Sequence, residues 1–227
     1  MTGSGAANGP IQVIACEVLR AEMELAGQGL DLEPVFLEQA LHHQPQRLAR
    51  LVQRAVDQAP AGEGPLRLAF GLCSNGLDAV RARDRGVVAP RCHDCVSLFL
   101  GSRETYQRRF AARPGTIYLS FGWLKAGQDP LSKLENQYLP RLGAGNAEWA
   151  LRQELKNYTH LALIDTGAGD MAVLRRRAQE NCRFFGLEYQ EIAGDLGYLR
   201  RLLLGGDDGP EFLRLAPGQE IEQKMYF

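Results

Sequence analysis

The chain has 227 residues, of which 45% are hydrophobic and 23% are charged. A chain of this length can bury roughly 70% of its unfolded surface without disulfides, so we expect one large globular domain or two small ones. Because the formal net charge is −1, there is no electrostatic argument for binding nucleic acid or an anionic membrane, and we expect neither partner.

The chain shows no targeting or membrane segment. No apolar stretch reaches the roughly 20 residues that a transmembrane helix needs. Residues 1–10 are rich in Gly, Ala and Asn, lack the charged-then-apolar order of a signal peptide, and are expected to form a disordered leader. We therefore expect a cytoplasmic protein, in which cysteines are thiols, metal ligands or catalysts rather than disulfides.

In the first half of the chain, short apolar runs alternate with amphipathic segments. The expected strands are Ile11–Ala15, Leu32–Leu37, Leu66–Phe70 and Val87–Ala89. The expected helices are Glu17–Ala26, Pro45–Val56, Leu77–Arg83, Val96–Leu100 and Ser102–Phe110. The turn 71–76, between a strand and a helix, is rich in glycine and polar residues.

The second half repeats this alternation. The expected strands are Gly115–Ser120, Leu161–Ile164, Tyr189–Ile192 and Phe212–Leu215, and the expected helical segments are Pro130–Tyr158, Met171–Phe185 and Asp195–Leu204. Strands separated by helices of this length predict an α/β fold, with a mainly parallel, Rossmann-like sheet flanked by helices. We expect one α/β domain over residues 11–227, or two lobes, 11–125 and 126–227, around a shared cleft.

Four of the five cysteines follow expected strands. Cys16 ends the first strand, Cys73 follows the third, and Cys92 and Cys95 follow the fourth. The carboxyl ends of parallel strands meet at one edge of a sheet, which is where open α/β folds bind ligands. Thiolates are soft ligands that favour zinc, copper(I) or iron–sulfur iron. The sequence therefore predicts a metal centre held by Cys16, Cys73 and Cys95, with Cys92 or His93 as the fourth ligand.

The spacing of Cys92 and Cys95 allows other interpretations. A C-x-x-C pair can chelate a metal, bracket a cluster edge, act as a thioredoxin-type dithiol, or simply place two small buried side chains at a helix start. Three thiolates leave one position of a tetrahedral zinc, or one iron of a four-iron cluster, open to substrate. Three cysteines from separate strand ends suit three corners of an iron–sulfur cluster, with one iron bound by each. We therefore favour an iron–sulfur cluster over zinc.

Three polar side chains near these strand ends are candidates for catalysis. His93 and Asp94 lie between the paired cysteines and are expected to transfer protons or to orient a neighbouring group. Asp165 ends a buried strand, where its carboxylate could act as a base or bind substrate, or else cap the next helix.

Residues around these positions are candidates for substrate binding, with structural alternatives for some of them. They are His42, Asn75, Arg91, Ser102, Thr166 and Trp123. His42 follows an apolar run and could instead cap or pack its turn, and Trp123 could instead belong to the core. No G-x-G-x-x-G or P-loop motif occurs at the expected position, so a dinucleotide or nucleoside triphosphate site is not supported. Cys182, on an expected helix, is expected to pack in the core.

Short motifs along the chain are similar to those of one protein family. They are Ile14-Ala15-Cys16, Leu41-His42 with Pro45, Gly71-Leu72-Cys73-Ser74-Asn75-Gly76, Pro90-Arg91-Cys92-His93-Asp94-Cys95, Leu100-Gly101-Ser102-Arg103, Gly122-Trp123, Ile164-Asp165-Thr166 and Pro217-Gly218-Gln219. Together they resemble the domain of unknown function number 1638, from Ile11 to Ile221.

The resemblance sharpens the site and leaves the reaction open. The most regular positions of the family correspond to Cys16, Cys73, His93, Asp94 and Cys95, whereas Cys92 matches a more variable position. The family is often encoded near corrinoid-dependent methyltransferases of methylated-amine metabolism. The resemblance implies this context, and with it a corrinoid or methyltransferase protein as partner.

We hypothesise an enzyme that uses an iron–sulfur or zinc centre on a small polar or methylated substrate, as a metal-dependent lyase or in methyl or group transfer. A second hypothesis is a non-catalytic metal-binding or accessory protein serving corrinoid-dependent methyl transfer. A third is a redox-sensitive α/β domain whose cysteines bind no metal. Cysteines near the surface would favour the accessory protein, and cysteines at the floor of a deep pocket would favour the enzyme.

Overall fold

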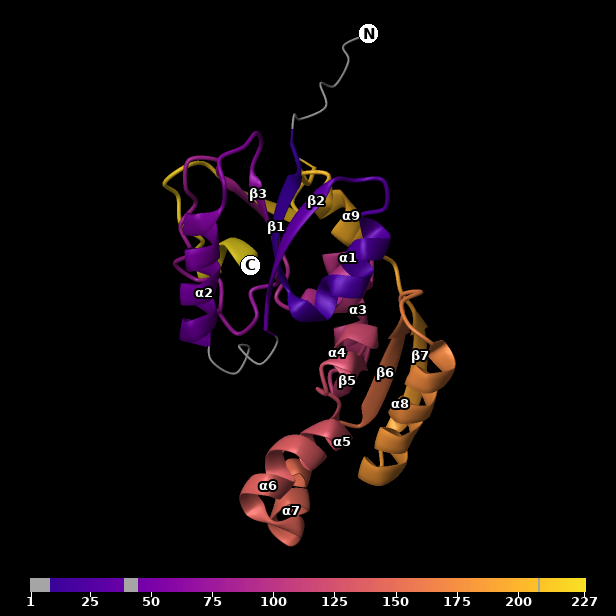
Figure 1. The fold of residues 1–227 in the computed structure, drawn as a ribbon. Coiled ribbons are helices and arrows are strands. Elements are labelled where there is room, and N and C mark those ends of the chain that lie inside the picture. Colours follow the sequence, from indigo (N-terminus) through magenta and orange to yellow (C-terminus); the bar gives the residue numbers. More distant parts are fainter. Residues whose placement is uncertain (1–8, 39–44, 208) are drawn as a thin grey trace. The chain divides into compact units, whose positions relative to one another are not determined.

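A computed structural model describes residues 9–38, 45–207 and 209–227 (Figure 1). The chain divides into two compact units. The first unit comprises the chain up to Arg103 together with Leu196–Phe227, and the second unit comprises Glu104–Asp195. These bounds differ from the expected lobes 11–125 and 126–227, because the last part of the chain returns to the sheet of the first unit.

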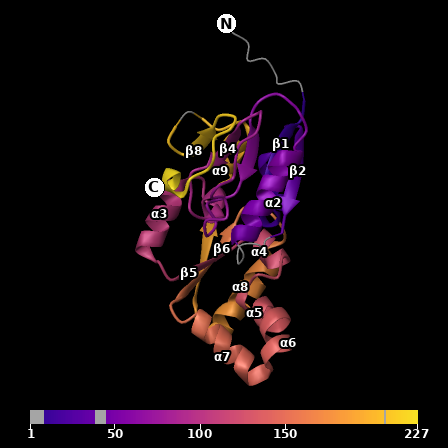
Figure 2. The ribbon, with the colours of Figure 1, turned by 90° about the vertical axis from the view of Figure 1, so that its left-hand side faces the viewer.

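The first unit is built on a five-stranded sheet in the order β2-β1-β3-β4-β8. Its strands are β1 (Ile11–Cys16), β2 (Leu32–Leu37), β3 (Leu66–Ala69), β4 (Val87–Pro90) and β8 (Phe212–Leu215). The first four are parallel, and β8 runs antiparallel beside β4 (Figure 2). The central strands are buried nearly throughout, which explains why their sequences are continuous apolar runs rather than alternating ones.

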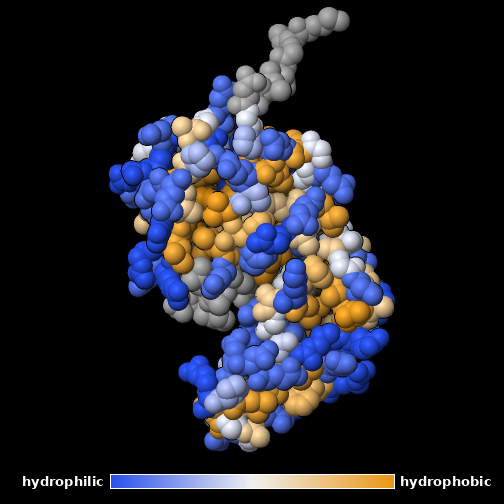
Figure 3. Space-filling model, viewed as in Figure 1, coloured by the Kyte–Doolittle hydropathy of each residue, from blue (hydrophilic) through white to orange (hydrophobic). Residues whose placement is uncertain are grey.

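Helices flank this sheet. They are η1 (Glu17–Leu19), α1 (Arg20–Ala26), α2 (Pro45–Gln58), η3 (Cys95–Phe99), α9 (Gly197–Leu203) and η5 (Gln223–Tyr226). In Figure 1, α2 lies to one side of the sheet, and α1 and α9 lie together on the other side. The apolar face of α2, formed by Leu48, Val52 and Val56, is buried. Figure 3 shows apolar side chains on the face where α2 lies against β1 and β2.

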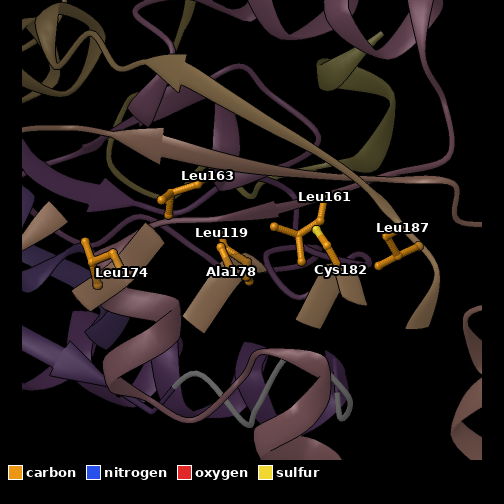
Figure 4. Packing of buried hydrophobic residues seen from close by; sticks show 7 residues of the cluster. All are labelled: Leu119, Leu161, Leu163, Leu174, Ala178, Cys182 and Leu187. Carbon is orange, nitrogen blue, oxygen red and sulfur yellow. The ribbon is translucent and has the colours of Figure 1, made fainter. Parts of the chain in front are cut away.

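The second unit has a three-stranded parallel sheet in the order β5-β6-β7. Its strands are β5 (Thr116–Leu119), β6 (His160–Asp165) and β7 (Glu188–Ala193). Its helical elements are α3 (Arg103–Ala112), α4 (Phe121–Lys125), α5 (Pro130–Lys133), η4 (Leu134–Tyr138), α6 (Leu139–Leu142), α7 (Ala144–Glu154) and α8 (Met171–Phe185). The first residue of α3, Arg103, belongs to the first unit. Side chains of α8 pack on the sheet in a compact core (Figure 4), formed by Leu119, Leu161, Leu163, Leu174, Ala178, Cys182 and Leu187. The expected core position of Cys182 is confirmed.

The helical segment expected over 130–158 is interrupted. A π-helical turn, η4, precedes Pro140, whose nitrogen cannot donate the hydrogen bond that a regular helix requires. Gly143 then ends α6 with φ +73°, a conformation that glycine adopts without strain. The proline and the glycine divide the expected helix into α5, η4, α6 and α7, which ends at Glu154.

The predicted α/β class, with mainly parallel strands flanked by helices in a Rossmann-like arrangement, is confirmed. One expected helix, Leu77–Arg83, is wrong. These residues form a turn and an isolated β-bridge, and their backbone is hydrogen-bonded to a segment far along the chain. Ala79 donates to the carbonyl of Ile221 at 2.9 Å, and Ala82 donates to that of Gln219 at 2.8 Å. In the described ranges, no helix combines the length and apolar character needed to cross a bilayer.

Candidate metal centre

Cys16 and Cys73 flank the point at which the order of the parallel strands reverses. Cys16 is the last residue of β1, and Cys73 lies four residues beyond the end of β3, the neighbouring strand. From β1 the chain continues to β2 on one side, and from β3 it continues to β4 on the other side. Such a switch point opens a crevice at the carboxyl edge of an α/β sheet, and ligands bind there.

The loop after β4 is held against the loop after β3. The Leu72 N–H donates to the carbonyl of Cys92 at 2.8 Å, and the Cys73 N–H donates to that of His93 at 3.1 Å. A Cβ atom on Gly71 would lie 2.8 Å from the carbonyl carbon of Asp94 and 2.9 Å from the nitrogen of Cys95. Only glycine allows the two backbones to approach this closely, and this approach brings Cys73 and Cys95 together.

The turn that carries Cys73 is left-handed at three successive residues. Cys73, Ser74 and Asn75 have φ angles of +47°, +57° and +67°, and the Gly76 N–H closes the turn by donating to the carbonyl of Cys73 at 3.0 Å. This conformation costs most residues other than glycine about 1–2 kcal/mol each, and asparagine less. Backbone strain of this kind is found preferentially at active and ligand-binding sites.

Cys73 is the junction of four buried cysteines. The exposed fractions are 0% for Cys16, 6% for Cys73, 0% for Cys92 and 2% for Cys95. Cys73 interacts electrostatically with each of the other three, and its thiol is hydrogen-bonded to that of Cys95. All four are thiols, without a disulfide. The predicted convergence of strand-end cysteines is therefore present within the first unit.

Burial disfavours ionisation of the Cys16, Cys92 and Cys95 thiols. Burial raises the pKa of Cys16 from 9.0 to about 12. The hydrogen bond to Cys73, together with burial, raises the pKa of Cys95 well above its ordinary value. Burial also raises the pKa of Cys92 strongly, partly offset by a hydrogen bond with the Ser97 side chain and by the Arg103 guanidinium. A bound metal cation reverses this balance, because a thiol that coordinates a metal is deprotonated.

Across residues 9–38, 45–207 and 209–227, no three His, Cys, Asp or Glu side chains form a preassembled set of metal ligands. What fits a metal here is the chemistry of the donors, since soft thiols are gathered in a water-excluded site at the ligand-binding edge of the sheet.

His93 and Asp94 have different contacts and differ in exposure. The Asp94 carboxylate caps η3 by accepting a hydrogen bond from the Val96 N–H at 2.9 Å. His93 is exposed, and its ring packs on Phe227 with a centroid separation of 4.9 Å. Asp94 thus positions the backbone of Cys95, whereas the proton-transfer role expected of both residues stays a prediction.

Two buried tyrosines near Cys92 were not expected from the sequence. Tyr198 and Tyr226 have exposed fractions of 0%, and both interact electrostatically with Cys92. Burial raises the pKa of each phenol. The Tyr198 hydroxyl donates to the carbonyl of Glu211, whereas the Tyr226 hydroxyl has no hydrogen-bond partner among the described residues. Because both tyrosines are more than 100 residues from Cys92, no local pattern could have indicated them.

The sequence profile of a family described as a protein of unknown function, DUF1638, matches residues 36–203. The chain belongs to this family. The resemblance seen in the sequence motifs is thus confirmed. No curated protein and no solved structure matches the chain. The DUF1638 match includes Cys73, Cys92 and Cys95, whereas Cys16 and Tyr226 lie outside it.

Three of the candidate substrate-binding residues lie in the first unit with the cysteines. Asn75 is exposed in the left-handed turn, and Ser102 is half-buried just before α3. Arg91 directly precedes Cys92, and its buried Nε has no hydrogen-bond partner in the described ranges. His42 lies outside the described residues. A substrate-binding role for these residues stays a prediction.

The remaining candidates belong to the second unit. Asp165 accepts a hydrogen bond from the Gly167 N–H at 3.0 Å, and Asp170, not Asp165, caps α8. Thr166 lies against the backbone at Gly194. Trp123 packs on the core of its own unit, as the structural alternative expected. That Asp165, Thr166 and Trp123 act together with the cysteines stays a prediction.

Proposed function

We propose that this DUF1638 protein binds a metal centre through Cys16, Cys73, Cys92 and Cys95, and that it is an enzyme. The observation that carries the proposal is the position of Cys73. Its thiol interacts with all three other cysteines from a strained turn at the switch point of the sheet. A hydrophobic core gains nothing from such strain, whereas a ligand held by the turn can compensate for it.

Cys92 suits the fourth ligand position better than His93. Cys92 is fully buried and interacts with Cys73, whereas the ring of His93 is exposed and packed on Phe227. The Arg103 guanidinium favours ionisation of Cys92 and would offset part of the charge of a thiolate set. His93 then remains available at the edge of the site as a proton donor or acceptor.

The donor set suits an iron–sulfur cluster or zinc. Four thiolates are the common ligands of both, and we favour the cluster because the sulfurs come from three separate strand ends. Lewis-acid activation of a small polar or methylated substrate needs an open coordination position, which the centre would have if Cys16, Cys73 and Cys95 hold it and the substrate takes the place of Cys92. With all four thiolates bound, the centre would instead supply an activated thiolate for methyl transfer. Lyase, methyl-transfer or other group-transfer chemistry would follow from these roles.

Burial favours an enzyme over an accessory protein that hands its metal on. None of the four cysteines is more than 6% exposed, so a partner's ligands could not reach the sulfurs without a conformational change. The exposed polar groups beside the cluster, Asn75 and His93, could contact a small substrate. We propose a cytoplasmic location, where the thiols stay reduced, and a corrinoid or methyltransferase protein as a further partner.

A thiol-based site is the other function with a specific observation in its favour. The thiols of Cys73 and Cys95 are hydrogen-bonded to each other, and a disulfide between them is the oxidation product that such a site would form. Such a site would hold no metal, and it would cycle between dithiol and disulfide.

Metal analysis with a visible absorption spectrum, on protein purified without oxygen, separates these functions. Iron with acid-labile sulfide and a broad band near about 400 nm supports the cluster. Stoichiometric zinc without colour supports a zinc enzyme. The absence of both metals would contradict the metal centre, and a Cys73–Cys95 disulfide on mild oxidation would then support the thiol-based site.

A further inference from the structure

A segment far from the cysteines in sequence is fastened to the loop that follows Cys73. We call residues 218–227 the strap. Ala79 donates to the carbonyl of Ile221 at 2.9 Å, and Ile221 donates to that of Val80 at 2.8 Å. The Gln223 N–H donates to the Asp78 carboxylate at 3.0 Å. The strap is thus held at its start within a few residues of the left-handed turn.

Further contacts fix the strap along its length. Arg81 and Glu220 form an ion pair and an isolated antiparallel bridge. At the other end, the ring of Phe227 packs on His93, the residue next to Cys92. The strap therefore runs from the loop that carries Cys73 to the loop that carries Cys92. In Figure 1 its last turn, η5, is the yellow helix beside the C label.

Tyr226 is the side chain that the strap buries beside the cysteines. It is fully buried, and it interacts electrostatically with Cys92 and Cys73. Within the part of the chain that the structure describes, its hydroxyl has no hydrogen-bond partner. Buried hydroxyl groups nearly always have a partner, because water is lost without compensation otherwise. A neutral thiol is a weak acceptor, but a thiolate is a strong one, since hydrogen bonds to ionised acceptors are shorter and stronger.

We propose that Tyr226 donates a hydrogen bond to a cysteine thiolate, Cys92 or Cys73, when the cluster holds its metal. Tyr226 is thereby a positioning residue that the strap carries into the site. This inference rests on the proposed metal centre. It assigns a task to an aromatic residue that lies outside the range of the family match. Outer-shell hydrogen bonds of this kind orient metal ligands and tune the metal.

The test compares Tyr226→Phe with a matched control, Tyr198→Phe, in the full chain purified without oxygen. Both substitutions remove only a hydroxyl from a fully buried ring near Cys92. Two quantities are measured: the thermal unfolding of chelator-stripped protein, and the rate and extent of metal loss to a competing chelator. The metal present after purification, iron or zinc, is the probe.

Tyr226→Phe is expected to leave the unfolding temperature of stripped protein unchanged or higher, and to weaken metal retention about 10- to 100-fold. Tyr198→Phe is expected to lower the unfolding temperature, because its hydroxyl bonds to Glu211, and to retain metal like the wild type.

Two results would overturn the inference alone: wild-type metal retention in Tyr226→Phe, or destabilisation of stripped Tyr226→Phe to the extent seen in Tyr198→Phe. If the wild-type protein holds neither iron nor zinc, the proposed metal centre fails and this inference fails with it.

Discussion

The two units present the same kind of sheet edge, but they complete it in different ways. In the second unit, the turn after β6 is satisfied locally, because Asp165 accepts the Gly167 N–H and the left-handed positions nearby, Gly167 and Gly169, are glycines. In the first unit, the turn after β3 is left-handed at Cys73, Ser74 and Asn75.

This difference shows where the sequence departs from what folding alone favours. At the β6 edge, the residues with a left-handed backbone are glycines, which adopt this conformation without strain. At the β3 edge, strained residues, four buried thiols and the unpartnered Tyr226 hydroxyl occur together. Local conflicts of this kind mark functional sites, because evolution tolerates them only for an activity. We therefore locate the function at the first edge.

The largest expected effect is the loss of metal on removal of the central cysteine. Cys73→Ala should lose nearly all of its bound metal, more than the 10- to 100-fold that outer-shell changes typically cost. The matched variant, Cys182→Ala, removes the buried cysteine of the second unit and should retain metal while losing about 1 kcal/mol of stability. Metal content per chain after anaerobic purification measures both. Equal metal content in the two variants would contradict the assignment of the metal centre to the cysteines of the first unit.

The alkaline stability of metal-stripped protein should depend on Cys16. Its pKa is raised from 9.0 to about 12 in the folded state, so below pH 9 the thiol is protonated in both states. Between pH 9 and 12 the unfolded chain releases a proton that the folded chain keeps. The contribution of Cys16 to the free energy of unfolding should fall by about 1.4 kcal/mol per pH unit, or about 4 kcal/mol in all.

Denaturant unfolding of stripped protein across this pH range measures the effect, with Cys16→Ala as the comparison. The substitution removes one titrating thiol, so the pH slope should be shallower by about 1.4 kcal/mol per unit. An identical slope in the two proteins would show that the Cys16 thiol does not resist ionisation in the fold.

Substitution of one glycine at each sheet edge compares two reasons for a glycine. One is the close packing of two backbone segments, and the other is a left-handed backbone conformation. A Cβ on Gly71 would meet the backbone of Asp94 and Cys95, so Gly71→Ala should cost about 3 kcal/mol and release metal. Gly167 has open space around it but φ +80°, so Gly167→Ala should cost about 1 kcal/mol and leave metal content unchanged. Chemical denaturation and metal analysis measure both, and loss of metal from Gly167→Ala would contradict the assignment to the first edge.

The smallest effect concerns the strained turn itself. Ser74→Gly removes the cost of a left-handed conformation but increases the freedom of the unfolded chain, so we expect a net change within about 1 kcal/mol. A looser turn should exchange metal faster. If Ser74→Gly is more stable than the wild type and exchanges its metal at the same rate, the strain in the turn has no part in holding a ligand.

The sequence predicts the parallel strands well, because buried strands leave continuous apolar runs, and it places all four cysteines at one edge. It does not predict that residues 77–83 form turns, since their backbone bonds to the strap about 140 residues later. Nor does it show that the strands divide into two sheets, because β5–β7 carry the same pattern as β1–β4. Sequence analysis does not identify Tyr226, because the burial of this side chain depends on packing between segments that are far apart in the chain.

The most direct test is X-ray absorption spectroscopy at the metal edge, on protein purified without oxygen. It counts sulfur neighbours and measures their distances from the metal. A centre held by these cysteines predicts three or four sulfur ligands at about 2.3 Å. In Cys73→Ala, this shell should be absent. A metal surrounded by nitrogen and oxygen alone, or a sulfur shell unchanged in Cys73→Ala, would contradict the account.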